Sequence, residues 1–518
     1  MKVNKLYSCD VLVIGSGLAG IQSAITAEKN GSNVILVSNG EIFSGSSFYK
    51  GTWGLGLIAP ENKQDEKNLA NQIKAVGCDM ATDEMVDSFV SGIQPAINNL
   101  IYMGLQLKQA ENKHEKDFIP CFDCKHRNWY GILQENAKEI FARYLCDVTL
   151  LDKTVLLKIV KHDDKVVGAV FSNKGKIFFI ESKATIIATG GFSGMFKQKL
   201  TSSDVTSIGQ ILAVECGAKL VNIEFMQMMP AYLKPMYGTV FNEKAFRYTY
   251  LYDENGSQID ISDDILTLRG THGPFTSRLK SCIVDFTFSD NPATVKYNDK
   301  IRENTPEFIK TYFDWLKKAK NLTIDDEITI SSFAHASNGG IVIDENAFTG
   351  INGLYACGEA TGGMHGADRI GGLSTANGLV FGQRAGQNAS EYAKNTDFIE
   401  KENIFIDDIG FLQNDEIINN IKSIMQKYCM ISKNAEGLKT AIDEINKLES
   451  YEKQKITDNY LLTRSIIAEK QLYTAKCILK AVNLRQESRG SHYRSDFPCQ
   501  SEIAKQILVD LNGVYYKN

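Results

Sequence analysis

The chain has 518 residues, of which 43% are hydrophobic and 23% are charged, and its formal net charge is −5. This length suits a globular protein of about two to four structural units with sizeable cores, and the acidic balance offers no basic surface for nucleic acid. No apolar run approaches the roughly 18 residues of a membrane span. The first ten residues lack the apolar region of a signal peptide and lead directly into a strand, so we expect a cytoplasmic protein.

Near the amino terminus the pattern predicts a βαβ unit. An apolar strand at 9–14 is followed by GSGLAG at 15–20, a helix, and a second strand at 33–38. This is the setting that the G-x-G-x-x-G motif requires. The first glycine makes the tight turn, the second lets backbone N–H groups approach a pyrophosphate, and the third packs the helix on the strand. A glycine-rich turn alone is weak evidence, but this context predicts a dinucleotide site.

The next segments predict more helices, a meander of strands and an inserted unit. Residues 60–145 are mostly helical, and strand patterns follow at 148–160, 165–171, 176–182 and 184–191. Residues 232–334 are richer in aromatic side chains and contain a DENG turn suited to a hairpin. The sheet pattern resumes near 340, and after 395 the chain has helical periodicity, with Ile417, Ile421 and Ile424 on one face.

The cysteines predict neither disulfides nor a metal site. Eleven of them are scattered between Cys9 and Cys499, which suits reduced thiols. Cys121 and Cys124 form a C-x-x-C pair, but no second pair completes a tetrahedral site, and Lys125 breaks the spacing of haem attachment. We expect ordinary loop cysteines and no metal.

A family resemblance explains why the second strand ends in Ser38 and not in the acidic residue of a plain NAD site. The segment VSNGEIFSGSSFYKGTWGLG (37–56) resembles the succinate dehydrogenase, fumarate reductase and L-aspartate oxidase flavoproteins, and most of all the aspartate oxidase branch. The resemblance covers nearly the whole chain, through ATGG (188–191), EFMQMMP (224–230), HASNGG (335–340), GLYACGEATGG (353–363), HGADRIGG (365–372) and ESRGSHYRSDFP (487–498).

This resemblance implies an α/β fold with a Rossmann-like FAD-binding domain at 1–231 and 335–395. An inserted α+β capping domain at 232–334 splits it, and a C-terminal helical domain at 396–518 follows. Ser47 stands where membrane-bound members carry a flavin-linked histidine, so the FAD is expected to be non-covalent.

The resemblance also implies the residues that contact FAD. Glu359 is expected to bind the ribose, and the backbone at Ser374 and Thr375 is expected to meet the flavin ring. The full set of expected FAD-binding residues is Gly15, Gly17, Leu18, Ala19, Gly20, Ser38, Asn39, Gly45, Ser46, Ser47, Val155, Ala188, Thr189, Gly190, Gly191, Asp204, Glu359, Ser374 and Thr375.

Arg369 corresponds to the family arginine that clamps a substrate carboxylate over the flavin, and His335 to a histidine that binds its oxygens. The chemistry agrees, because a guanidinium presents a planar fork to a carboxylate, and a buried arginine needs an anion. The alternatives are an ion pair with a nearby carboxylate such as Asp368, and a satisfied core histidine. The expected catalytic residues are Arg369, His335, Gln227, Arg278 and Glu243.

Two family positions are replaced. Met229 occupies the position of a substrate-binding histidine in the family, and Phe275 occupies the position of the proton-donating arginine of the cap. Because both side chains are apolar, we expect an apolar pocket near them, suited to a monocarboxylate, an enoate or an amino acid with an apolar tail. Arg278 would share a helical face with Phe275. His272 and Arg247 are further candidates for the missing proton donor, and Glu243 lies near the position of a proton-relay glutamate in the family. Surface or packing roles are equally open to these residues.

The expected function is hydride transfer between flavin N5 and a small carboxylate substrate, with oxygen, a fumarate-like compound or an electron-transfer protein as acceptor. One alternative is a flavoprotein subunit that passes electrons to an iron–sulfur partner, and another is a flavin-binding protein that has lost catalysis.

Overall fold

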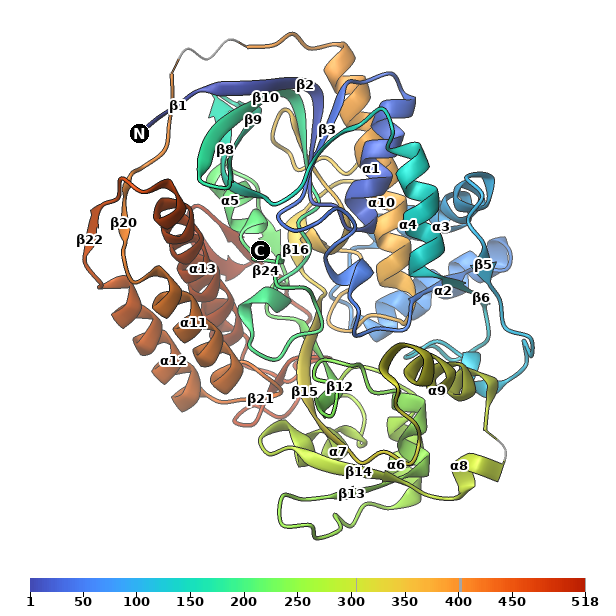
Figure 1. Cartoon of the computed structure of the whole chain (residues 1–518). Coiled ribbons are helices and arrows are strands. Elements are labelled where there is room, and N and C mark those ends of the chain that lie inside the picture. Colours follow the sequence, from blue (N-terminus) through green and yellow to red (C-terminus); the bar gives the residue numbers. More distant parts are fainter. Residues whose placement is uncertain (304, 400–402, 518) are drawn as a thin grey trace.

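The computed structural model describes residues 1–303, 305–399 and 403–517 (Figure 1). Residue 304 of the predicted cap and residues 400–402 and 518 of the predicted helical domain lie outside the described residues. Among the described helices, none has the length and apolarity needed to cross a bilayer.

A seven-stranded sheet lies at the centre of the predicted FAD-binding domain. Its strands are β2 (Lys5–Ile14), β3 (Val34–Val37), β7 (Thr149–Leu151), β8 (Thr154–His162), β9 (Lys165–Asn173), β10 (Lys176–Ile187) and β17 (Leu354–Ala356). The order is β7-β3-β2-β10-β9-β8, and β17 pairs with β10. Strands β7, β3, β2 and β10 are parallel, and β10, β9 and β8 form the predicted antiparallel meander.

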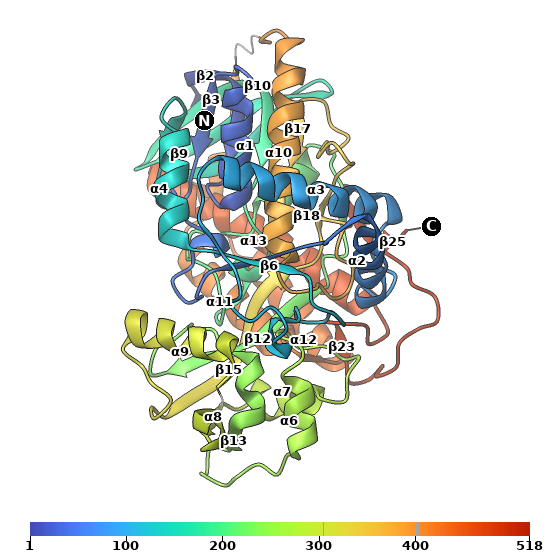
Figure 2. The same cartoon turned by 90° about the vertical axis from the view of Figure 1, so that its right-hand side faces the viewer.

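Two helices pack closely together beside this sheet. They are α1 (Leu18–Lys29) and α10 (Leu373–Lys394), and Figure 2 shows α3 (Asp83–Tyr102) crossing α10. A Cβ atom placed on Gly382 would lie 2.7 Å from the carbonyl oxygen of Ala19. The glycine therefore lets the two helices approach, which places the start of each one beside the same cleft.

The segment predicted to be mostly helical also contains a small sheet. Besides α3, its helices are α2 (Lys63–Val76) and α4 (Gln134–Tyr144). Its strands β5 (Leu107–Lys108) and β6 (Asn128–Ile132) form a sheet with β4 (Leu55–Ala59), which precedes the segment, in the order β4-β6-β5. The short helix α5 (Gly209–Glu215) follows later in the chain.

The inserted cap is an α+β unit with its own core, drawn green to yellow in Figure 1. Its antiparallel sheet has the order β12-β15-β14-β13, formed by β12 (Met226–Lys234), β13 (Thr249–Tyr252), β14 (Ala293–Tyr297) and β15 (Ile328–Ser337). Its helices are α6 (Asp263–Arg269), α7 (Cys282–Ser289), α8 (Lys300–Glu303) and α9 (Glu307–Lys320). Strands β12 and β15 run across both predicted boundaries, so the division at those residues stays a prediction.

The C-terminal part contains the predicted helical unit and ends in a short hairpin. Its helices are α11 (Asn414–Tyr428), α12 (Ala435–Glu449) and α13 (Asn459–Leu484), and the predicted isoleucine face of α11 is buried. The last residues form a hairpin of β24 (Ile507–Asp510) and β25 (Gly513–Tyr516). This hairpin pairs with β11 (Leu220–Val221) in a sheet that continues through β16 (Gly340–Val342) and β18 (Thr361–Gly362). The predicted C-terminal helical unit is therefore present, and a short hairpin with its turn at Leu511 and Asn512 follows it.

Short strands complete the described structure: β1 (Lys2–Val3), β19 (Ile404–Phe405), β20 (Ile409–Phe411), β21 (Ser432–Lys433), β22 (Lys453–Lys455) and β23 (Tyr493–Arg494).

Candidate active site

A glycine turn at the carboxyl end of β2 opens a long cleft. Gly15 has φ +115°, and a Cβ atom placed on it would lie 2.2 Å from the carbonyl oxygen of Ala188. A Cβ atom on Gly20 would lie 1.8 Å from the carbonyl oxygen of Gly15, whereas one on Gly17 would meet nothing closer than 3.7 Å. Two glycines therefore permit tight packing, and Gly17, the N-cap of α1, leaves the backbone open to an anion in the cleft.

Most of the predicted FAD-binding residues line this cleft. Ser374 and Thr375 line its far chamber. Gly20 and Gly191 lie behind the wall, where a Cβ atom on Gly191 would be 2.3 Å from Oε1 of Glu359. The residues that line the near part are Gly15, Gly17, Leu18, Ala19, Ser38, Asn39, Gly45, Ser46, Ser47, Val155, Ala188, Thr189, Gly190, Asp204 and Glu359.

Without a break in its lining, the cleft continues into the far chamber lined by Ser374 and Thr375, which we call the flavin chamber. Leu18, Ala19, Ser46, Ser47 and Glu359 line both parts. Oε1 of Glu359 accepts a hydrogen bond from the backbone N–H of Ser337 (2.9 Å), and burial raises the pKa of the Glu359 carboxyl. The shape suits an extended dinucleotide, with the glycine turn at one end and the flavin chamber at the other.

Arg369 lies in the flavin chamber and is 8% exposed. Its Nε has no hydrogen-bond partner among the described residues, and its Nη1 donates only a long bond (3.4 Å) to the carbonyl oxygen of Ile370. The neighbouring Asp368 instead accepts from Nε of Arg278 (2.9 Å) and from Oγ1 of Thr276 (2.7 Å). The ion pair between Arg369 and Asp368 that could have explained this arginine does not form.

His335 and Gln227 bring further unused hydrogen-bonding groups to this region. His335, on β15, lines the chamber, and burial together with the positive charge of Arg369 lowers its pKa to about 3. Gln227 lies on β12 opposite Ala336, which also lines the chamber. Within the described ranges, Nδ1 of His335 and both side-chain polar atoms of Gln227 are buried without partners. Such groups are costly unless a ligand satisfies them.

Glu243 lies beside a cavity that adjoins this chamber. Sγ of Cys121 donates to Oε1 of Glu243 (2.9 Å), and burial raises the pKa of the Cys121 thiol. A Cβ atom on Gly273 would lie 3.5 Å from both Sγ of Cys121 and Cε of Met229. The Cys121 thiol, the Glu243 carboxyl and the Met229 side chain therefore lie close together around Gly273. The described cysteines are free thiols, and no cluster of metal-ligating side chains occurs in the described part of the chain.

The segment around Phe275 differs from the expectation. Residues 272–280 form turns, not a helix, so Arg278 does not share a helical face with Phe275. Phe275 is fully buried, and its ring packs against Phe286 (5.8 Å between centroids) and Tyr493 (6.3 Å). The expected apolar pocket is therefore not at Phe275, because this ring completes a core contact with the C-terminal segment.

The other candidates for the proton donor expected in place of Phe275 have partners within the cap. Nη2 of Arg247 pairs with Asp117 (2.5 Å). His272 is buried, donates from Nδ1 to the carbonyl oxygen of Pro274 (2.8 Å), and has its pKa lowered well below the usual value by burial. Arg247 and His272 thus have packing roles in the cap. Arg278 and Gln227 line neither the flavin chamber nor the cavity beside Glu243.

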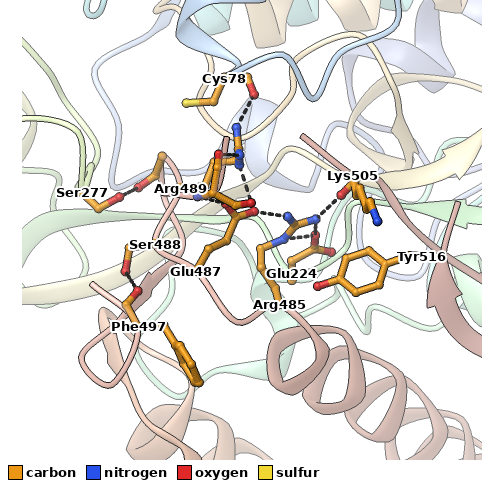
Figure 3. A network of polar contacts seen from close by, with 12 residues as sticks. Cys78, Glu224, Ser277, Arg485, Glu487, Ser488, Arg489, Phe497, Lys505 and Tyr516 are labelled. Carbon is orange, nitrogen blue, oxygen red and sulfur yellow. Dashed lines mark hydrogen bonds and ion pairs between the residues drawn. The ribbon is translucent and has the colours of Figure 1, made fainter. Parts of the chain in front are cut away.

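The C-terminal segment contains a buried polar network (Figure 3). Oε1 of Glu487 accepts from Nη1 of Arg485 (2.6 Å) and from Nε of Arg489 (2.9 Å). Arg485 also pairs with Glu224 (2.7 Å). Just beyond this network, the hydroxyl of Ser491 donates to the carbonyl oxygen of Ala367 (2.8 Å). The C-terminal segment thus contacts the 365–372 loop two residues before Arg369.

Comparison with known proteins decides the family. Residues 10–375 match the family model described as FAD binding domain, and residues 418–506 match that described as fumarate reductase flavoprotein C-term. This chain belongs to the FAD binding domain family. It is an FAD-dependent oxidoreductase related to fumarate reductases and L-aspartate oxidases, and the predicted fold and cofactor are confirmed.

Relatives of this flavoprotein match over almost their full length. One subunit of the fumarate reductase (CoM/CoB) of Methanothermobacter marburgensis is 25% identical, with 98% of each chain covered. L-aspartate oxidase of Vibrio cholerae is 26% identical, covering 98% of this chain and 99% of that protein. The structure of E. coli quinol fumarate reductase superimposes with a TM-score of 0.79 at 21% identity, covering 99% of this chain and 97% of that one.

Several residues of the flavoprotein site were missed from the sequence. Thr52, Gly54, Leu55 and Gly56 line the flavin chamber, although they belong to the segment 37–56 that carries the resemblance. Their glycine-rich spacing was a usable signal, since glycines permit close approach of a ligand to the backbone.

Proposed function

We propose that this flavoprotein catalyses hydride transfer between flavin N5 and a carbon next to the carboxylate or amine of a small carboxylate substrate. The observation that carries the proposal is the buried guanidinium of Arg369, whose Nε has no hydrogen-bond partner among the described residues and which lies at the flavin end of the cleft. A substrate carboxylate would supply that anion.

The side chains around Arg369 suit the binding of one carboxylate. The planar fork of Arg369 can donate two parallel hydrogen bonds to it. His335 stays neutral at physiological pH because its pKa is about 3, so it can donate one hydrogen bond without a second buried positive charge. The bound FAD would supply hydride chemistry, while the protein orients the substrate and excludes water.

The test is a screen of carboxylates and amino acids for bleaching or reoxidation of the bound flavin, repeated with Arg369→Lys. Lysine keeps the charge but loses the two-pronged geometry. We expect the variant to retain FAD and to lose about 100-fold or more in kcat/KM, because small misplacements of a reacting group cost this much.

The matched control is Arg384→Lys on α10, where the arginine donates to Ser88 (2.6 Å) away from the flavin chamber. Equal kinetics for Arg369→Lys and wild type would overturn the proposal. A protein that binds FAD but reacts with no carboxylate would support the alternative that catalysis has been lost.

A second candidate function is that of a flavoprotein subunit which passes electrons to an iron–sulfur partner. The similarity to a protein named as one subunit of a fumarate reductase favours it. Purification from the native cell with a stoichiometric iron–sulfur protein would support it, and full turnover by the isolated chain with a small-molecule acceptor would argue against it.

A further inference from the structure

An aromatic cavity of about 410 Å³ adjoins the flavin chamber. It lies between the small β4-β6-β5 sheet and α9 of the cap. Its rings belong to Trp53, Phe118, Trp129, Phe308 and Trp315. The chain has three tryptophans, and all of them line this one space. We call it the tryptophan cavity.

The rings form a wall and do not fill the space. Trp53 meets Phe308 edge to face (4.8 Å between centroids), and Phe118 meets Trp129 (5.4 Å) and Phe308 (5.6 Å). All three tryptophans are only partly buried, so part of each ring surface stays available. Indole and phenyl surfaces of this kind bind apolar groups, and the cavity volume is within the usual range of about 300–1,000 Å³ for small-molecule sites.

The tryptophan cavity and the flavin chamber have a common wall. Gly54, Leu55, Gly56 and Gly372 line both spaces. Three of these four positions lack a side chain, so the common wall there is mostly backbone. A Cβ atom on Gly56 would lie at an ordinary contact distance of 3.7 Å from Nε1 of Trp129. A side chain would therefore fit at this position, and the glycine leaves that space beside Trp129 unfilled.

The charged groups of the cavity do not favour a second carboxylate. Asp117, Glu243 and Asp314 line it, and Asp117 is paired with Arg247 (2.5 Å). The ammonium of Lys244 donates to the carbonyl oxygen of Ile119 (3.2 Å). Lys108 and Lys318 are exposed, so water screens their charges. The lining thus carries three carboxyl and three ammonium groups, so it offers the second charge of a dicarboxylate no excess of positive charge.

We propose that the tryptophan cavity binds the apolar tail of the substrate whose carboxylate Arg369 holds. The substrate class is then a carboxylate with an aryl or extended hydrocarbon group, and not a small dicarboxylate. This inference rests on the proposed function for the carboxylate end, and on the common glycine wall for the tail.

The test compares three acrylates that differ only at the carbon opposite the carboxylate. Crotonate carries a methyl group there, cinnamate a phenyl group and fumarate a second carboxylate. Dissociation constants with the FAD-loaded protein would come from the flavin absorption spectrum. We expect cinnamate to bind about 10- to 100-fold more tightly than crotonate, from the additional apolar surface buried, and fumarate to bind no better than crotonate.

Tryptophan fluorescence gives a second readout, because every tryptophan of the chain lines the cavity. Cinnamate should change the emission with the same dissociation constant that the flavin spectrum reports, and saturating crotonate should change it far less.

A variant on α9 fills the cavity without touching the flavin chamber. Thr311 lines the tryptophan cavity, while Lys317 on the same helix is exposed and does not. Thr311→Phe should weaken cinnamate binding by about 10-fold or more and leave crotonate within about two-fold. Lys317→Phe, the matched control, should change neither constant.

The outcomes separate this inference from the proposed function. Equal affinities for cinnamate and crotonate, or equal losses of both in Thr311→Phe, would overturn the role of the cavity even if Arg369→Lys abolishes binding. Equal binding of cinnamate and its neutral amide would instead overturn the carboxylate clamp, while weaker binding of both cinnamate and the amide to Thr311→Phe would still support the cavity.

Discussion

Arg369 and Asp368 carry opposite charges and are adjacent in sequence, yet they serve different partners. Burial raises the pKa of Asp368 from 3.8 to about 6, against the lowering effect of Arg278 and of the hydrogen bond from Thr276. By occupying Asp368, Arg278 leaves the guanidinium of Arg369 available for a ligand. Arg278, expected among the catalytic residues, is thus better explained as a positioning residue.

Replacement of Arg278 by leucine should destabilise the fold by about 2–4 kcal/mol at neutral pH. A buried charge that loses its partner costs about 3–5 kcal/mol, and the loss is smaller here because the Arg278 side chain is 25% exposed. The free energy of unfolding in urea measures it. The control is Arg464→Leu, whose partner Asp415 is 70% exposed, and its cost should stay below about 1 kcal/mol.

The same pair predicts a pH dependence. The pKa of Asp368 is raised in the folded state, so the protonated carboxyl favours folding. This contribution to stability is fully present below pH 3.8 and is lost as the pH rises through about 6. Without Arg278 this pKa rises further. The stability difference between wild type and Arg278→Leu should therefore be large at pH 8 and shrink below pH 6. A difference that stays constant would mean that Asp368 is not the group involved.

At the scale of elements, the sequence specified the parts of the site that lie within one local motif. The glycine turn, its flanking strand and helix, and the meander all follow from short-range patterns. The surroundings of Phe275 and the hairpin β24–β25 depend on contacts between segments far apart in the chain, as does the tryptophan cavity. Trp53, Trp129 and Trp315 have no common spacing, so only the packing of the cap on the small sheet reveals that they meet.

The C-terminal segment is an element whose function we predict from its contacts. Besides the two arginines, Glu487 accepts from the backbone N–H of Ser501 (2.8 Å). Glu487→Gln removes the charge that balances Arg485 and Arg489, so we expect a loss of about 2–4 kcal/mol in unfolding free energy. Looser support of the 365–372 loop should also weaken carboxylate binding several-fold.

The comparison variant is Glu449→Gln, whose partner Lys476 forms an exposed pair with it (2.6 Å). This change should leave both quantities almost unaltered. If Glu487→Gln lowers stability but carboxylate affinity is unchanged, the network stabilises the fold without positioning Arg369.

At the scale of the whole molecule, the cofactor cleft unites distant parts of the chain. Its wall combines the turn at 15–20, the segment 44–47, residues 188–190 and Glu359, while His335 arrives on β15 from the cap sheet. A ligand bound there contacts several segments that are far apart in the chain, so its binding free energy adds to the stability of the folded state.

This arrangement predicts that FAD stabilises the apoprotein increasingly as its concentration rises above the dissociation constant. At 100 times its dissociation constant, a ligand adds about 2.7 kcal/mol, so the unfolding temperature should rise steadily with the logarithm of FAD concentration. Riboflavin lacks the pyrophosphate and adenosine that the glycine turn accommodates, and it should stabilise far less at equal concentration. Because Ser47 offers no imidazole for a covalent bond, acid precipitation of the loaded protein should release intact FAD into the supernatant. Equal stabilisation by riboflavin would show that the cleft at Gly15–Gly20 does not hold the pyrophosphate. In the precipitation experiment, flavin that stays in the denatured pellet would contradict the non-covalent attachment.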